Sequence, residues 1–192
     1  MERQCFFKGE IRPLSEVPLR ADDIGFLRGY GVFEVLRTYS SRPFLLERHL
    51  DRLESSADTL GLGNLPSREN ISSAMDRLID KFPNTEVSLR IVLTGGATPD
   101  GLSLDPSSST FLIIAEEFVG PDEGLYESGV ALFPTEHRRV FPGAKTLNYI
   151  FPIKTKRGAD GFFDLLYTSD GKVLESSTSN FFLVKDGTLI TA

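Results

Sequence analysis

The spacing of apolar residues changes along the chain, and this change limits the possible folds more than any other feature of the sequence. In residues 1–119, segments with a strand-like period of two alternate with segments that have a helix-like period of 3.6. Residues 120–124, Gly-Pro-Asp-Glu-Gly, interrupt this pattern, and short strand-like runs dominate after them. The pattern predicts a first domain at 1–119, a linker at 120–124 and a second domain at 125–192.

The periods also predict the elements of the first domain. A strand over 31–39 has Phe33 and Arg37 on one face and Glu34 on the other, and a strand over 86–94 has Arg90 opposite its apolar face. Further elements are expected as strands at 44–46 and 110–116 and as amphipathic helices at 47–60 and 67–79.

The second domain is predicted to be rich in strands. One helix is expected over 146–158, and Asp-Gly turns at 170–171 and 186–187 should close two hairpins. The chain stops at Ala192 directly after the second hairpin, which would leave an unpaired sheet edge. We therefore expect this sequence to be a truncated or incompletely recorded protein.

Composition excludes several classes of function. A net charge of −6 without a basic stripe argues against nucleic acid or an anionic membrane as the main partner. No apolar run approaches the roughly 20 residues that span a bilayer, and the first residues lack a signal-peptide core. A single cysteine, Cys5, excludes an internal disulfide and suits a reducing compartment, so the cytoplasm is the expected location. Two distant histidines and this cysteine do not form a zinc set, so no metal is expected.

Four segments carry residues that suggest chemistry, and their order and spacing are more specific than any one of them. They are Arg28-Gly29-Tyr30-Gly31-Val32-Phe33-Glu34, His49-Leu50-Asp51-Arg52-Leu53, Lys145-Thr146-Leu147-Asn148-Tyr149 and Glu175-Ser176-Ser177-Thr178-Ser179-Asn180-Phe181-Phe182. Together they resemble the fold-type IV (class IV) enzymes that use pyridoxal 5'-phosphate (PLP), over about residues 23–191. This resemblance implies an α+β, two-domain fold like that of D-amino acid aminotransferase, with an incomplete, β-barrel-like second domain.

Lys145 is the central residue of this resemblance, which implies that it holds PLP as a Schiff base. Such an amine must be partly neutral near pH 7, although an ordinary lysine has a pKa of about 10.4. Lys145 lies between a turn and a predicted helix start, where the helix dipole disfavours a cation. The alternative is an ordinary surface lysine.

The resemblance also assigns the other cofactor contacts. Glu175 would pair with the pyridine nitrogen, Arg52 would bind the phosphate as a planar fork, and Tyr149 would lie near the phenolic oxygen. Thr178, Ser179 and Asn180 would approach the cofactor from the polar run after Glu175. The residues alone are also consistent with simpler roles. Glu175 would then be a solvated charge at the end of a strand, and Arg52 an exposed cation on a helix near Asp51 and Glu54. His49 is expected to be structural.

Substrate residues are expected on the sheet. Phe33 and Arg37 lie four strand positions apart, roughly 13 Å, so that one can line the pocket while the other reaches a carboxylate. Arg90 falls where branched-chain aminotransferases have an arginine, and the arginine that traps the carboxylate in D-specific members would fall near Gly95. These positions favour an L-amino acid of the branched-chain type. The short spacing from Lys145 to Tyr149 is instead closer to the lyases and D-specific enzymes of the family.

Three functions remain open at this point. The first is transfer of an amino group between an amino acid and a 2-oxo acid by a cytoplasmic homodimer. The second is the 4-amino-4-deoxychorismate lyase reaction, and the third is an inactive remnant or binding module, because the truncation would remove part of the phosphate site.

Overall fold

The computed structural model describes residues 1–191, which divide into two compact units. The first contains Met1–Val119 together with Gly143–Asn148, and the second contains Gly120–Pro142 and Tyr149 onward. The boundary after Val119 lies at the start of the predicted linker. The segment 143–148 differs from the sequence-based division, because it clusters with the first unit rather than the second.

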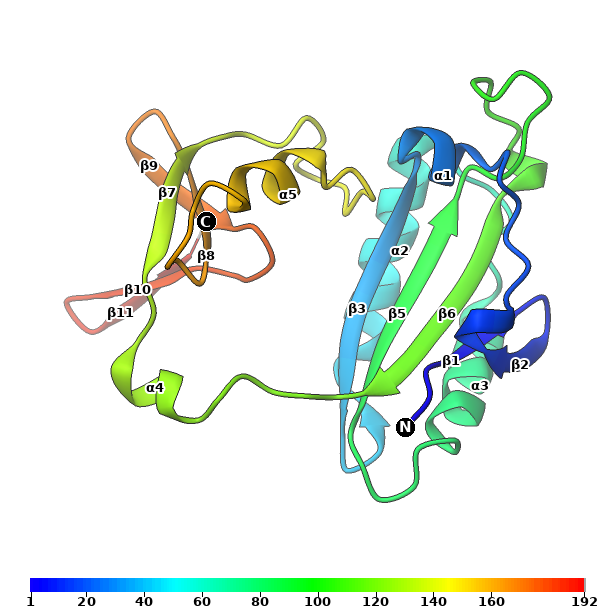
Figure 1. Ribbon diagram of the computed structural model, residues 1–192, viewed down its shortest axis with the longest axis horizontal. Helices are drawn as coiled ribbons and strands as arrows, with labels where there is room; N and C mark the ends of the chain where they lie inside the picture. Colours follow the sequence, from blue (N-terminus) through cyan, green and yellow to red (C-terminus); the bar gives the residue numbers. More distant parts are fainter. Residues whose placement is uncertain (192) are drawn as a thin grey trace. The chain divides into compact units, whose positions relative to one another are not determined.

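The first unit is built on one antiparallel sheet with the strand order β2-β1-β6-β5-β3-β4. Helices α2 and α3 lie on the same face of this sheet (Figure 1). The strands are β1 (Gln4–Phe7), β2 (Glu10–Pro13), β3 (Gly31–Tyr39), β4 (Arg42–Pro43), β5 (Val87–Thr94) and β6 (Thr110–Glu117), and the helices are α1 (Ile24–Arg28), α2 (Leu46–Leu60) and α3 (Arg68–Ile79).

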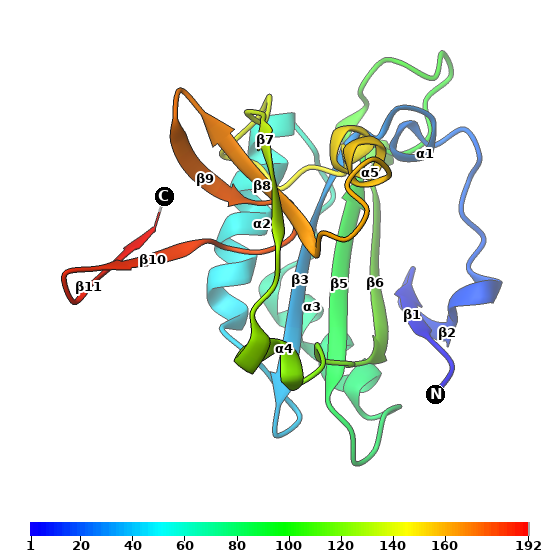
Figure 2. The same cartoon turned by 60° about the vertical axis from the view of Figure 1, so that its left-hand side comes forward.

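The main core lies between this sheet and the two helices (Figure 2). Val32 and Leu36 of β3 face α2, whereas Phe33 and Arg37 face the other side, as their alternation predicts. The helical stripes are buried as well, and α3 begins at the predicted cap, where Ser67 Oγ accepts a bond from Asn70 N at 3.3 Å. The strands and helices of this core therefore follow the apolar periods closely.

Three parts of the first unit differ from the sequence-based expectation. The β1–β2 hairpin and the short helix α1 were not predicted, since each strand of the hairpin has four residues and α1 has five, too few to show a clear period. The predicted strand at 44–46 is also wrong. β4 instead covers Arg42–Pro43, and Leu45 has a left-handed φ of 50° and precedes α2.

The second unit has a three-stranded sheet in the order β7-β8-β9, and a separate hairpin, β10–β11. β7 and β8 pair in parallel and β8 and β9 antiparallel, while Asp170-Gly171 and Asp186-Gly187 adopt the positive φ values expected of hairpin turns. The elements are α4 (Gly124–Ser128), β7 (Leu132–Glu136), α5 (Ile150–Lys156), β8 (Asp164–Ser169), β9 (Lys172–Ser176), β10 (Phe182–Lys185) and β11 (Thr188–Thr191).

The helix predicted over 146–158 is shorter than expected, because α5 begins only at Ile150. Lys145 therefore does not precede a helix start, and the helix-dipole argument for a less stable lysine cation does not apply. Among the described residues, no helix is long and apolar enough to cross a membrane, and no cluster of His, Cys, Asp or Glu is suited to a metal ion.

Candidate active site

The backbone around Lys145 pairs with the first residues of β3. Lys145 O accepts a hydrogen bond from Phe33 N at 3.0 Å, and Leu147 N donates to Gly31 O at 2.9 Å. Lys145 N also donates to Ser56 Oγ of α2 at 3.1 Å. The lysine is therefore attached to the rigid sheet and helix of the first unit rather than carried on a loose loop.

Gly31 makes this close approach possible. A Cβ at this position would lie 2.6 Å from Leu93 O and 2.7 Å from Leu147 Cδ1, closer than side-chain carbons approach such atoms. Any larger residue would push the lysine segment away from β3. Packing of the lysine segment on the strand thus explains Gly31, the second glycine of the Arg28–Glu34 motif.

On the sheet face opposite α2, the side chains of Lys145 and Arg90 both lie over the ring of Phe33. Lys145 Nζ lies 4.8 Å from the centroid of the Phe33 ring, and the guanidinium carbon of Arg90 lies 5.8 Å from the same centroid. Arg37 is placed differently, because its guanidinium stacks on Tyr39 at 4.1 Å and on Phe118 at 3.7 Å. Of the three predicted substrate residues, Phe33 and Arg90 therefore cluster with Lys145, and Arg37 packs on other rings.

Arg52 on α2 forms an ion pair with a completely buried carboxylate, Glu34 of β3. Its Nε and Nη2 donate to Glu34 at 2.5 and 2.6 Å, and His49 Nδ1 lies 2.8 Å from the second carboxylate oxygen. Burial raises the pKa of Glu34, but the bonds from Arg52 and His49 outweigh it, so that the pKa is lowered and Glu34 stays charged.

This ion pair lies close to the lysine segment. Ser56, which accepts the bond from Lys145 N, is one helical turn beyond Arg52, so both residues are on one face of α2. Asp51 and Glu54, the carboxylates next to Arg52 in the sequence, both bond Arg68. The Arg52 guanidinium is half exposed, and Glu34 fixes its plane through Nε and Nη2.

In the second unit, Glu175 is held by an arginine that the motifs did not include. Arg139 Nε donates to Glu175 Oε1 at 2.6 Å, and Arg139 Nη2 donates to Ser177 O at 3.2 Å. Glu175 Oε2 accepts no hydrogen bond from the residues that the structure describes. Tyr149 lies next to the same arginine, with its ring centroid 5.8 Å from the guanidinium carbon.

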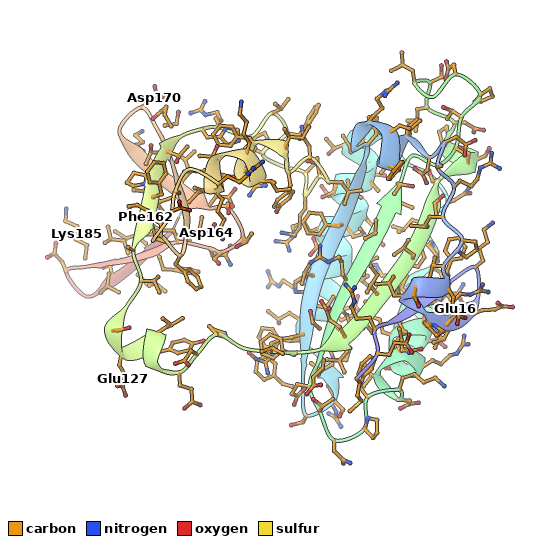
Figure 3. The ribbon with its side chains drawn as sticks, in the orientation of Figure 1. Glu16, Glu127, Phe162, Asp164, Asp170 and Lys185 are labelled. Atoms are coloured by element: carbon orange, nitrogen blue, oxygen red, sulfur yellow. The ribbon has the colours of Figure 1, made fainter. Side chains whose placement is uncertain are left out.

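The polar run after Glu175 is folded around Asp164, which begins β8 and is labelled in Figure 3. Asp164 is almost completely buried and accepts bonds from the hydroxyl groups of Ser176, Ser177 and Thr178, and also from Thr178 N at 3.2 Å. Burial raises the pKa of Asp164, but these bonds outweigh it and lower the pKa to about 2. Both donors of Thr178 are thus committed to Asp164, and Ser179 O accepts from Ser176 N at 3.0 Å.

Sequence reasoning did not identify Glu34, Ser56, Asp164 or Arg139 as site residues. Glu34 did have a visible signal, since it is a carboxylate on the apolar face of a strand that precedes a helix with His49 and Arg52. Arg139 and Asp164 lie outside any regular period, and nothing in the sequence distinguishes them from surface charges.

Comparison with known proteins places this geometry in a family. The model of the amino-transferase class IV family matches residues 31–192, which is most of the chain. The chain belongs to the class IV aminotransferases. It is 26% identical over 194 residues to the D-alanine aminotransferase of Bacillus licheniformis, covering 98% of this chain and 68% of that protein. It is also 29% identical over 197 residues to branched-chain-amino-acid aminotransferase-like protein 1 of Arabidopsis thaliana, covering 95% of this chain but 35% of that protein.

A solved aminotransferase structure supports the same fold. The crystal structure of an aminotransferase from Brucella abortus, bound to the cofactor PLP, superposes with a TM-score of 0.81 at 28% identity, covering 100% of this chain and 71% of that one. The class IV aminotransferases are PLP-dependent enzymes, and the residues of this chain are compatible with that cofactor. Lys145 supplies an amine on a backbone that β3 and α2 hold, Arg52 presents a half-exposed guanidinium of the kind that suits a phosphate, and Glu175 has an oxygen that no described residue bonds.

Proposed function

We propose that this class IV aminotransferase transfers an amino group between an amino acid and a 2-oxo acid, with PLP attached to Lys145. The observation that carries the proposal is the attachment of Lys145 to β3 and α2 by three backbone-mediated hydrogen bonds, those of Lys145 O, Lys145 N and Leu147 N. A lysine held in this way presents its amine from a fixed point, as covalent and proton-transfer chemistry requires. When bound, PLP supplies an electron sink for the carbanion that forms at the substrate carbon.

We assign the other steps, cofactor binding and proton transfer, to individual residues of the chain. Lys145 binds the cofactor reversibly and, once released by the substrate amine, moves the proton of the substrate α-carbon. Arg52 binds the phosphate while Glu34 fixes the orientation of its guanidinium. Glu175 pairs with the pyridine nitrogen, and Tyr149 contacts the ring oxygen. Ser179 and Asn180 are proposed as further contacts, whereas Thr178 contributes through its bond to Asp164.

We further propose an L-amino acid with an apolar side chain as the substrate. Phe33 and Arg90 support this choice, since the one offers an apolar surface and the other a carboxylate partner beside Lys145. Arg37 is the weaker candidate for binding the carboxylate, because its guanidinium stacks between two aromatic rings. A homodimer is proposed from the family relationship, and sedimentation equilibrium of the purified protein would test it.

Cofactor binding is tested first. The purified protein is incubated with PLP, the link is reduced with borohydride, and the labelled peptide is identified by mass spectrometry. Label on Lys145, absent from Lys145→Ala but present in Lys154→Ala as the matched control, supports the proposal. A protein that takes up no PLP at any lysine would contradict it and would favour an inactive remnant or binding module.

Activity is tested with the loaded protein. L-leucine, D-leucine, L-alanine and D-alanine are each supplied with 2-oxoglutarate, and formation of glutamate is measured. Faster transfer from L-leucine supports the proposed substrate, and faster transfer from either D-amino acid rejects it. Release of pyruvate from 4-amino-4-deoxychorismate without amino transfer would identify the lyase reaction instead.

A further inference from the structure

Arg139 connects two parts of the second unit that the proposed function uses. It follows β7 in the chain, yet its Nε bonds the Glu175 carboxylate of β9 at 2.6 Å and its Nη2 bonds the carbonyl of Ser177 at 3.2 Å. The same side chain thus holds both the carboxylate and the backbone two residues after it. A guanidinium does this well, because its donors are fixed in one plane.

The surroundings of Arg139 hold it in place. Its guanidinium carbon lies 5.6 Å from the centroid of the buried Tyr167 ring and 5.8 Å from that of Tyr149. Tyr167 in turn packs edge-on against His137, with centroids 4.8 Å apart, and His137 stacks on Phe151 at 3.7 Å. The side chain of Arg139 is consequently 24% exposed, whereas that of its neighbour Arg138 is 67% exposed.

The charge of this pair is also constrained. Burial lowers the pKa of Arg139, but the bond to Glu175 and the nearby Tyr149 oxygen outweigh it, so the pKa is raised and the arginine stays a cation. The carboxylate of Glu175 is therefore held by a permanent cation at a fixed distance.

We propose that Arg139 is a positioning residue, which fixes the orientation of the Glu175 carboxylate so that Oε2 can meet the pyridine nitrogen of the cofactor. The inference rests on the proposed function, because it requires Glu175 to meet that nitrogen. A carboxylate held against the ring nitrogen stabilises the protonated form of that nitrogen. Without Arg139, Glu175 is free to rotate away from the ring, and the nitrogen loses this stabilisation.

The test compares Arg139→Gln and Arg139→Lys with Arg138→Gln. Arg138 is the matched control, since it is the adjacent arginine but pairs with Asp170 at 3.6 Å instead of Glu175. Each protein is loaded with PLP labelled with ¹⁵N in the ring, and the ring-nitrogen signal is followed by NMR as the pH is raised. Thermal unfolding of the same samples reports the purely structural effect of each substitution.

In Arg139→Gln, we expect the proton affinity of the ring nitrogen to fall about tenfold or more, as loss of a charge-assisted contact predicts. Arg139→Lys should lie between this variant and the wild type, because it keeps the charge but not the planar fork. Arg138→Gln should titrate like the wild type. This pattern would support the proposal.

Two other results would overturn it in distinguishable ways. A wild-type protein that takes up no PLP would reject the proposed function and the role of Arg139 together. Wild-type loading combined with an unchanged ring titration in Arg139→Gln would reject the role of Arg139 alone, even if that variant unfolds at a lower temperature. If Arg139→Gln does not fold, an Arg139→Lys protein that titrates like the wild type would overturn the positioning role.

Discussion

Glu34 and Arg52 form a two-point ion pair across the β3–α2 interface, in which the carboxylate is completely buried and the guanidinium is half exposed. Removal of Arg52 and removal of Glu34 should therefore destabilise the fold by different amounts. Arg52→Met leaves a buried carboxylate with only His49 as a partner, whereas Glu34→Gln leaves a guanidinium that water can still reach.

We expect Arg52→Met to lower the free energy of unfolding by about 2 kcal/mol or more, and Glu34→Gln by about 1 kcal/mol. In the double variant the loss should be smaller than the sum. Urea denaturation of the four proteins measures these values, with Arg48→Met, an exposed arginine of the same helix, as the control. Strictly additive losses would show that the pair does not act as a unit.

Gly31→Ala should disturb the lysine segment, because the new Cβ would collide with Leu93 O and Leu147 Cδ1. Overpacking of this kind costs about 1–3 kcal/mol, so the apparent affinity for PLP should fall about tenfold. Spectroscopic titration with PLP measures the change. Gly143→Ala is the matched control, since a Cβ at Gly143 meets nothing within 4 Å; equal effects of the two substitutions would contradict the prediction.

Arg90→Gln should lower kcat/KM for the amino acid by about 10-fold to 100-fold, as loss of a charge-assisted carboxylate contact predicts. Arg37→Gln should have a smaller effect, because Arg37 packs on Tyr39 and Phe118 rather than near Lys145. Steady-state rates with the loaded enzyme would measure both. The assignment of the carboxylate contact to Arg90 would be wrong if Arg37→Gln were the more damaging change.

Asp164 should make the stability of the second unit depend on acid pH. Its pKa is lowered to about 2 in the folded protein from an ordinary value of 3.8, so its contribution is complete above about pH 4 and is lost as the pH falls toward 2. The shift corresponds to about 2 kcal/mol. Asp164→Asn should therefore lower the free energy of unfolding at pH 7 and flatten its decline below pH 4. Asp160→Asn, at an exposed position, should leave both unchanged.

Cys5 should be unreactive in the folded protein. Its thiol is completely buried, and burial raises its pKa to about 11, so little thiolate is present at pH 8. Labelling with a thiol-specific disulfide reagent should be at least about 100-fold slower in the native protein than in urea. Rapid labelling of the folded protein would mean that β1 opens readily.

The strands of the first unit were predictable because one face of each is buried. β3, β5 and β6 agree with the predicted ranges to within about one residue, since a shift by one would move Val32 and Leu36 out of the core. The segment around Lys145 was not predictable in this way. It was expected to enter a helix at Thr146, but its backbone instead pairs with β3, over 100 residues earlier in the chain.

The candidate site was likewise predictable only in part. The order and spacing of the four motifs, three of which contain Arg52, Lys145 and Glu175, resemble the class IV family, and the family match confirms that membership. Which charges pair with them was decided by the tertiary structure. Arg52 bonds Glu34 rather than its helix neighbours, and Glu175 bonds Arg139 from a loop with no period.

The sequence by itself therefore determined the family and the buried faces of the strands and helices, and it predicted the reacting groups. These properties are local, since they depend on residue type and on spacing along one element. The tertiary structure alone decided that Lys145 lies on β3, that Arg90 rather than Arg37 shares Phe33 with it, and that Glu34, Asp164 and Arg139 hold the proposed site residues. Such pairings depend on contacts between segments that are distant in the sequence. A buried charge needs a matching charge or hydrogen-bond donor, but the spacing of residues along the chain does not indicate which residue supplies it.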